Sequence, residues 1–262
     1  METEFIENRG NDFFDKQDCE LKAFYRLVEK LKQRFPQMEI CLLLDGLYPG
    51  KRVFSICKKY RWKYLITFKE GSMPAVYREY EDLKFLESQE RVPENRLEET
   101  SRDGLVKQIY TWIEGIEYED HLFLNVLECE ETKQGKTTHF VWLTSFSISK
   151  WNGAKLARGA RLRWKIENEG FNVQKKGGYE LEHAYSEDPV AMKNFYLLLQ
   201  MAHTIMQLME RGNLFNGPVV KLYGSLRNFA DKLLIALTTQ LLHFQEMVVL
   251  LNQRIQIRFN TS

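Results

Sequence analysis

Apolar and polar residues follow two kinds of pattern in the first part of the chain. Over residues 18–35 apolar residues recur every three or four positions, which predicts an amphipathic helix capped by Asp18 and ended by Pro36. Residues 39–44 and 64–68 are instead short, continuous apolar runs, typical of strands buried on both faces. A helix from about 50 to 60 joins them, so the pattern predicts a βαβ unit with a right-handed crossover.

Later segments change character twice. An acidic helix is predicted over 74–87, followed by a charged loop around Pro93 and by β-type runs at 107–114, 121–129 and 138–146. A hairpin turn is expected at 132–136, and we interpret the three runs as an antiparallel insertion. Helical patterning resumes near Gly153. From Pro189 onward the chain is predicted to be helical, with an apolar stripe from Met192 to Met209 as core and one or two helices over 226–251 packed on it.

Composition excludes several classes of protein. The four cysteines and five histidines show no ligand spacing, so a disulfide scaffold or a zinc site is not expected, and a reducing cytoplasm is the default location. Buried free thiols are expected for Cys41 and Cys57. No signal peptide is recognisable, and polar residues interrupt the most apolar stretch, 233–251, which indicates a packed helix and no membrane partner.

Charge is distributed unevenly although the net charge is only +1. Residues 150–176 contain eight basic and two acidic side chains, whereas residues 79–103 contain nine acidic and four basic ones. A local basic cluster of this kind favours a polyanionic partner, although charge runs are also common on ordinary solvated faces.

The segment 163–172 is the first candidate for chemistry. Arg163 and Glu167 are four residues apart, so one continuous helix would place them on the same face. Two apolar pairs have spacings that would pin this helix to a core: Leu162 with Ile166, and Trp164 with Phe171. We interpret Trp164 as a packing residue. The alternative for the whole segment is an amphipathic helix with a surface ion pair.

Asp45 is the second candidate. It follows a buried strand at its carboxyl end, where open α/β sheets place their ligands, and Gly46 permits close approach. The alternative is an Asp-Gly pair that only forms a turn. If the fold brings Asp45 and Glu167 together, the two carboxylates would suit divalent cations, and nearby basic residues would hold DNA phosphates.

These residues resemble the DDE transposases of the insertion-sequence type 4 group. That family has the signature tyrosine, two residues, arginine, three residues, glutamate, six residues, lysine, and here Arg163 and Glu167 match it. The run 166–172 also resembles one subset of the family, and Asp45, in Leu-Leu-Leu-Asp-Gly-Leu-Tyr, resembles the second acid of its triad. The resemblance extends over roughly residues 15–185. The resemblance implies a metal-dependent enzyme that cleaves and transfers DNA strands, with Asp45 and Glu167 as the second and third catalytic acids and ligands of two Mg²⁺ or Mn²⁺ ions.

The resemblance also implies DNA contacts by Arg163 and Lys175, with Lys165 and Arg161 as weaker candidates. Two signature positions depart from the family. Ala160 replaces the tyrosine, and Gln174 replaces the lysine, so the lysine role passes to Lys175 one residue later. Glu169 is a competing acid on the same helix.

The first acid of the triad is missing from the match. Asp12 and Asp15 are near the start, but no apolar strand leads into them. We therefore expect a chain that begins after the first catalytic strand, with weak metal binding, slow cleavage and an exposed sheet edge beside Asp45. For this reason the assignment as an active enzyme stays open.

The expected fold class is α/β: an incomplete ribonuclease H-like core with a β-rich insertion and a helical carboxyl-terminal region. The expected divisions are 1–72 for the first part of the core, 73–149 for the insertion, 150–185 for the catalytic helix segment and 186–262 for the helical region. Expected partners are DNA, as transposon ends and target, and a second copy or a full-length transposase. In the cell the protein would be cytoplasmic and nucleoid-associated when bound to DNA.

Three other interpretations compete. The chain is either a non-catalytic remnant that binds DNA or inhibits a full-length transposase, or a metal-dependent nuclease of the same broad fold, or a frameshifted or mis-started product without function. Joining of a target strand in addition to nicking would separate the transposase from the nuclease.

Overall fold

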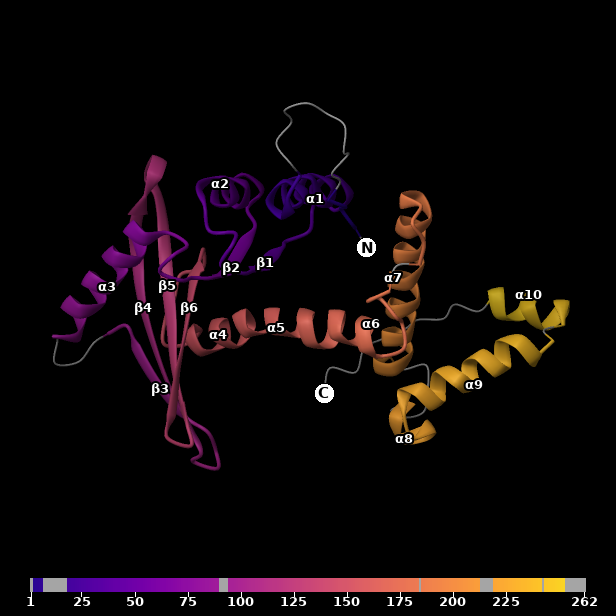
Figure 1. Ribbon diagram of the computed structural model, residues 1–262. Helices are drawn as coiled ribbons and strands as arrows, with labels where there is room; N and C mark the ends of the chain where they lie inside the picture. Colours follow the sequence, from indigo (N-terminus) through magenta and orange to yellow (C-terminus); the bar gives the residue numbers. More distant parts are fainter. Residues whose placement is uncertain are drawn as a thin grey trace. The chain divides into compact units, whose positions relative to one another are not determined.

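The computed structural model describes residues 2–6, 18–89, 94–183, 185–212, 219–241 and 243–252 (Figure 1). Asp12, Asp15 and Pro93 lie outside these residues, so what was expected of them stays a prediction. The chain divides into two compact units, Met1–Lys165 and Ile166–Ser262, and each unit is a separate body with its own elements.

The first unit begins with the predicted βαβ arrangement. Its elements are α1 (Glu20–Arg34), β1 (Cys41–Leu44), α2 (Lys51–Tyr60) and β2 (Lys63–Thr67). β1 and β2 are parallel, with Cys41 opposite Lys63 and Leu44 opposite Ile66. The two apolar runs and the helix between them therefore form the unit that their periodicity predicts.

A helix and four antiparallel strands follow. They are α3 (Pro74–Ser88), β3 (Arg96–Thr100), β4 (Val106–Tyr118), a 3₁₀ turn (Glu119–His121), β5 (Leu122–Lys133) and β6 (Lys136–Thr144). The hairpin between β5 and β6 turns on Gln134 and Gly135, both with positive φ (51° and 77°), as a two-residue turn of this kind requires. β3 was not predicted, because its Arg-Leu-Glu-Glu-Thr sequence contains a single apolar residue.

The six strands in the described part of the chain form one mixed sheet in the order β1-β2-β6-β5-β4-β3. β6 pairs antiparallel with β2, with Ile66 opposite Leu143, and so joins the βαβ unit to the antiparallel strands. The expected insertion is thus antiparallel, and its strands extend the same sheet. The fold class is α/β.

Helices cover both faces of this sheet. α1, α2 and α3 supply apolar side chains to one buried cluster, which includes Val28, Val53, Tyr80, Ile66 and Leu143. The opposite cluster is covered by α4 (Gly153–Arg161), whose small residues Ala154, Ala157 and Ala160 pack against Leu65 and Trp142. α5 (Arg163–Lys165) continues directly from α4, so the sheet positions the candidate Arg163.

β1 differs from its prediction in burial. It was expected to be buried on both faces, but Cys41 is exposed and Leu42, Leu43 and Leu44 are only half-buried. The reason is its place in the sheet: within the described part of the chain β1 is an edge strand, paired with β2 alone. Among the described residues, the edge beside Asp45 is therefore exposed, as expected. Of the four cysteines, all free, Cys57 and Cys129 are buried.

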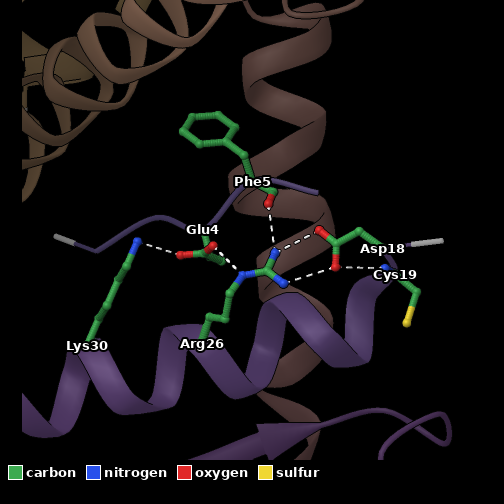
Figure 2. Close-up of polar contacts among 6 residues, drawn as sticks. All are labelled: Glu4, Phe5, Asp18, Cys19, Arg26 and Lys30. Atoms are coloured by element: carbon green, nitrogen blue, oxygen red, sulfur yellow. Dashed lines mark hydrogen bonds and ion pairs between the residues drawn. The ribbon is translucent and has the colours of Figure 1, made fainter. Parts of the chain in front are cut away.

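Residues 2–6 lie along α1 and are held there by charge (Figure 2). The Arg26 guanidinium donates to the Glu4 carboxylate at 2.6 Å and to the Phe5 carbonyl at 3.0 Å. Lys30 forms an ion pair of 2.5 Å with the same Glu4, and these bonds lower the pKa of Glu4 against the opposing effect of its burial.

The predicted capping role of Asp18 is wrong. Cys19 is the N-cap of α1 and makes no side-chain capping bond. The Asp18 carboxylate instead accepts two bonds from Arg26, at 2.7 and 3.0 Å, and one from the Cys19 backbone N–H at 3.1 Å. Because the Asp18 carboxylate binds Arg26, in the second turn of α1, it does not cap the helix.

The second unit is helical. It contains a π-helical segment (Ile166–Phe171), α6 (Asn172–Lys176), α7 (Pro189–Arg211), α8 (Val219–Tyr223), α9 (Leu226–Thr239) and α10 (Phe244–Asn252). α7 begins with Pro189 after Asp188, whose carboxylate accepts from the Ala191 N–H at 2.7 Å and caps the helix.

The apolar stripe of α7 was predicted to be core, and this is only partly right. Leu199 is buried, but Met192 and Ile205 are about half exposed. The last helices, α9 and α10, also leave Leu237 and Phe244 largely exposed, so these apolar side chains are not covered as expected. None of the described helices has the length and apolar composition that a membrane span needs.

Candidate functional site

Asp45 lies immediately after β1, at the carboxyl end of the parallel pair. Its Oδ1 accepts the Leu47 backbone N–H at 2.9 Å, which fixes a tight turn. The Gly46 carbonyl accepts the Ser72 hydroxyl at 2.8 Å, and a Cβ on Gly46 would come within 3.4 Å of that hydroxyl oxygen. The turn is therefore clamped to the loop that follows β2, while 41% of the Asp45 side chain stays exposed.

Arg163 is brought to Asp45 by the fold. Its Nη1 lies 4.0 Å from Asp45 Oδ2, although the two residues are 118 positions apart in the chain. Both belong to the first unit. A pair this long and this exposed adds less than about 1 kcal/mol of stability, so its interest lies in the placement of a cation beside a strand-end carboxylate.

A cleft of about 740 Å³ is lined by Arg163, though not by Asp45. It lies where β6 runs past the end of β2, beyond the bond from the Phe68 N–H to the Val141 carbonyl. Aromatic and cationic side chains share its wall: Tyr77, Phe140, Trp142, Trp164, Lys69, Arg161 and Arg163. Such a wall suits a ligand that is both anionic and able to stack.

Trp164 is exposed in this cleft and is not a core anchor. Its side chain is 65% exposed, and Leu162, Ile166 and Phe171 are also about half exposed. The predicted packing of these four residues is therefore wrong. The prediction assumed one continuous α-helix, but the helix becomes π-helical from Ile166, which changes the faces on which later residues lie.

Arg161 makes a two-pronged ion pair with Glu131, at 2.6 and 3.3 Å, and stacks over the Phe140 ring at 4.6 Å. The pair lowers the pKa of Glu131 and raises that of Arg161, in each case chiefly through the hydrogen bond between them. The charge of Arg161 is thus largely matched inside the protein, which weakens it as a candidate for an external anion.

The remaining candidates flank or belong to the second unit. Lys165 ends α5 and is exposed. Glu167 is an exposed residue of the π-helical segment, and the competing acid, Glu169, pairs with Arg211 at 3.1 Å. Because Asp45 and Glu167 belong to different units, their meeting depends on how the units assemble and stays a prediction.

The two residues that differ from the transposase signature are both buried. Ala160 packs against the sheet and also lines the cleft. Gln174 is buried and exchanges two hydrogen bonds with Gln200 of α7, at 3.0 and 2.9 Å. Lys175, next in sequence, is exposed in α6, so the basic group is displaced to the surface by one residue.

One polar group of this region was missed at the sequence level. The Glu128 carboxylate, 4% exposed, binds the Tyr80 hydroxyl, Lys84 and His139. A signal exists: Glu128 continues the inward-facing positions of β5 after Leu124 and Val126, where an apolar residue is expected. A charged residue at an inward position of a strand marks a buried polar network.

A metal site is implied only by the resemblance. Across the part of the chain that the structure describes, no three His, Cys, Asp or Glu side chains gather in a way that could hold a metal ion. Asp45 and Glu167 have the hard oxygen ligands that Mg²⁺ and Mn²⁺ favour, and the two-ion site stays a prediction that rests on these two residues.

The chain was also compared with known proteins. No family model matches it, and no curated protein matches it. Its interpretation rests on its own residues and their geometry.

Proposed function

We propose that this protein belongs to the DDE transposase type and binds DNA at the cleft beside Asp45. The observation that carries the proposal is the approach of Arg163 to Asp45, 4.0 Å between charged groups, in a βαβ unit that ends in the acid. Two residues chosen from separate sequence motifs meet at the edge where such sheets bind ligands.

The cleft wall supports DNA as the ligand. Lys69 and Arg163 offer positive charge for phosphates, while the exposed Trp164 offers an aromatic face for a base. The metal would be held by Asp45 and Glu167 and would activate the attacking oxygen and stabilise the leaving one. The first acid of the triad is the one for which the resemblance finds no match in this chain.

The edge of β1 favours a second candidate function. An apolar, half-exposed edge strand is a template for pairing with another chain. Through this edge the protein would pair with a full-length transposase. In this non-catalytic form it would bind DNA or inhibit its partner without cleaving DNA itself. The non-catalytic, inhibitory form of the proposal therefore stands beside the catalytic one.

The first experiment measures binding of a duplex oligonucleotide by fluorescence anisotropy over a range of salt concentrations. Arg163→Gln is expected to weaken binding several-fold and to reduce the salt slope by about 1, because one phosphate contact is lost. Arg102→Gln, an exposed arginine in the turn after β3, is the matched control and should bind as the unmodified protein does. Equal binding by both variants would remove Arg163 from the interface.

The second experiment follows nicking of supercoiled plasmid in Mg²⁺ or Mn²⁺. If the chain is catalytic, Asp45→Asn and Glu167→Gln are each expected to abolish nicking, while Asp103→Asn, an exposed turn residue, should leave it unchanged. Nicking that survives both substitutions would refute the site. DNA binding without nicking, together with inhibition of a full-length transposase in a mixing assay, would establish the non-catalytic form.

A further inference from the structure

Outside the residues of the transposase signature, the polar side chains with the most contacts to one another form a network around Glu128. The carboxylate lies in β5 and is almost fully buried. Its Oε2 accepts the Tyr80 hydroxyl at 2.5 Å and pairs with Lys84 Nζ at 2.5 Å, both from α3. Its Oε1 lies 3.0 Å from His139 Nδ1, on the neighbouring strand β6. Three side chains from two elements therefore fix the position of one carboxylate.

These contacts determine which nitrogen of His139 carries a proton. Burial alone would raise the pKa of Glu128, but the bonds from Lys84, Tyr80 and His139 outweigh it and the pKa is lowered. An ionised carboxylate only accepts hydrogen bonds, so His139 Nδ1 must be the donor. The second ring nitrogen, Nε2, then accepts in the neutral imidazole and donates in the protonated one.

His139 also lines the cleft that contains Arg163 and Trp164. Its side chain is 55% exposed, in contrast to the buried Glu128 behind it. A buried carboxylate that orients an accessible imidazole is the arrangement that protein sites use to fix the tautomer and to stabilise the imidazolium. A surface histidine without such support would be free to choose either tautomer.

We propose that His139 is a phosphate-binding residue of this cleft, held by Glu128, and that binding of a DNA phosphate is accompanied by uptake of one proton at Nε2. The proposal deepens the DNA-binding function and rests on it for the identity of the ligand. In the bound state Nδ1–H donates to Glu128 and Nε2–H donates to a phosphate oxygen.

The charges around His139 explain why protonation and binding would favour each other. Lys84 already balances Glu128, and Lys69 is a further cation among the side chains that line the cleft with His139. A phosphate adds the negative charge that an imidazolium needs there. The titratable and charged groups that face this position from the surrounding elements are Glu128 and Glu130 of β5, Tyr77, Tyr80 and Lys84 of α3, and Lys69 and Glu70 after β2. Arg161 and Arg163 line the cleft from α4 and α5, on the opposite face of β6, where Arg161 stacks over Phe140.

The test measures the affinity for a labelled oligonucleotide between pH 6 and pH 8. Linked uptake of one proton makes binding tighter as pH falls, by up to about tenfold per pH unit. His139→Gln is expected to remove this part of the pH dependence. His121→Gln is the matched control, because His121 is an exposed histidine of the turn before β5 that does not line this cleft, and it should retain the full dependence.

A second measurement does not require DNA binding. In ¹⁵N NMR of the imidazole groups, His139 should carry its proton on Nδ1, and inorganic phosphate should shift the Nε2 signal. A proton on Nε2, or an Nε2 signal that phosphate leaves unchanged, would overturn the proposal.

The two proposals fail in distinguishable ways. DNA binding with the same pH dependence in the unmodified protein and in His139→Gln would refute the role of His139 and leave the DNA-binding function intact. No DNA binding at any salt concentration, with a phosphate-sensitive Nε2 of His139, would refute the DNA-binding function and support the anion site.

Discussion

Replacement of Leu143 by alanine is expected to lower the free energy of unfolding of the first unit by about 3 kcal/mol, within the usual range of roughly 2–5 for such truncations. Leu143 is fully buried in β6, between Ile66 of β2 and Val126 of β5, which are also fully buried. Removal of its side chain leaves a cavity where the two parts of the sheet join. Denaturation in urea, followed by tryptophan fluorescence, would measure the change.

Leu105→Ala is the control for this prediction. Leu105 is 62% exposed in the turn before β4, so its truncation should change the free energy of unfolding by less than about 0.5 kcal/mol. Equal effects at the two positions would contradict the pairing of β6 with β2 as the centre of the core.

Glu128→Gln is expected to cost about 2 to 3 kcal/mol of stability. The substitution removes the charge that Lys84 and His139 face, and it weakens the acceptor of the Tyr80 hydroxyl inside the core. The figure is at the low end for a buried ion pair, because Lys84 is about one-third exposed and is partly hydrated. Glu130→Gln, two residues along the same strand and half-buried, is the matched control and should have a small effect.

The same substitution should change how stability depends on pH. The pKa of Glu128 is lower in the folded protein than its ordinary value of 4.5, so its contribution is complete above that value. The contribution is lost as pH falls through the folded pKa, because the carboxyl becomes protonated. The difference in stability between the unmodified protein and Glu128→Gln should therefore shrink as pH falls below about 4.5. A difference that grows below that pH would contradict the network.

Predictions from local patterns succeeded where a short segment carries its own periodicity. The apolar runs around β1 and β2, the helix between them and the turn at Gln134 and Gly135 all lie close to where the sequence places them. Each depends on residues within about one element length, so neighbouring side chains decide it.

The burial predictions failed where the partner of an apolar face was assumed. β1 was expected to be covered on both faces, and Trp164 was expected to be an anchor, yet β1 is an edge strand among the described residues and Trp164 is exposed. An apolar residue indicates that burial is favourable, but the pattern does not identify what buries it. The same error applies to Met192 and Ile205 of α7.

The residues of the candidate site also divide into those that the local sequence predicts and those that only the fold brings together. Asp45 follows from the sequence, because an acid at the end of an apolar run is visible in six residues. Its neighbour Arg163, and the network of Glu128 with His139, depend on contacts across the fold, and His139 has no local pattern that marks it.

The sequence by itself determined the α/β class, the βαβ unit that ends in Asp45 and the hairpin of β5 and β6, because these depend on short-range periodicity and turn chemistry. Only the tertiary structure decided that β6 joins β2, that Arg163 stands beside Asp45 and that a buried Glu128 holds His139 at the cleft. These depend on strand register and on the packing of residues that are far apart in the chain, where a shift of one position would turn each side chain to the other face.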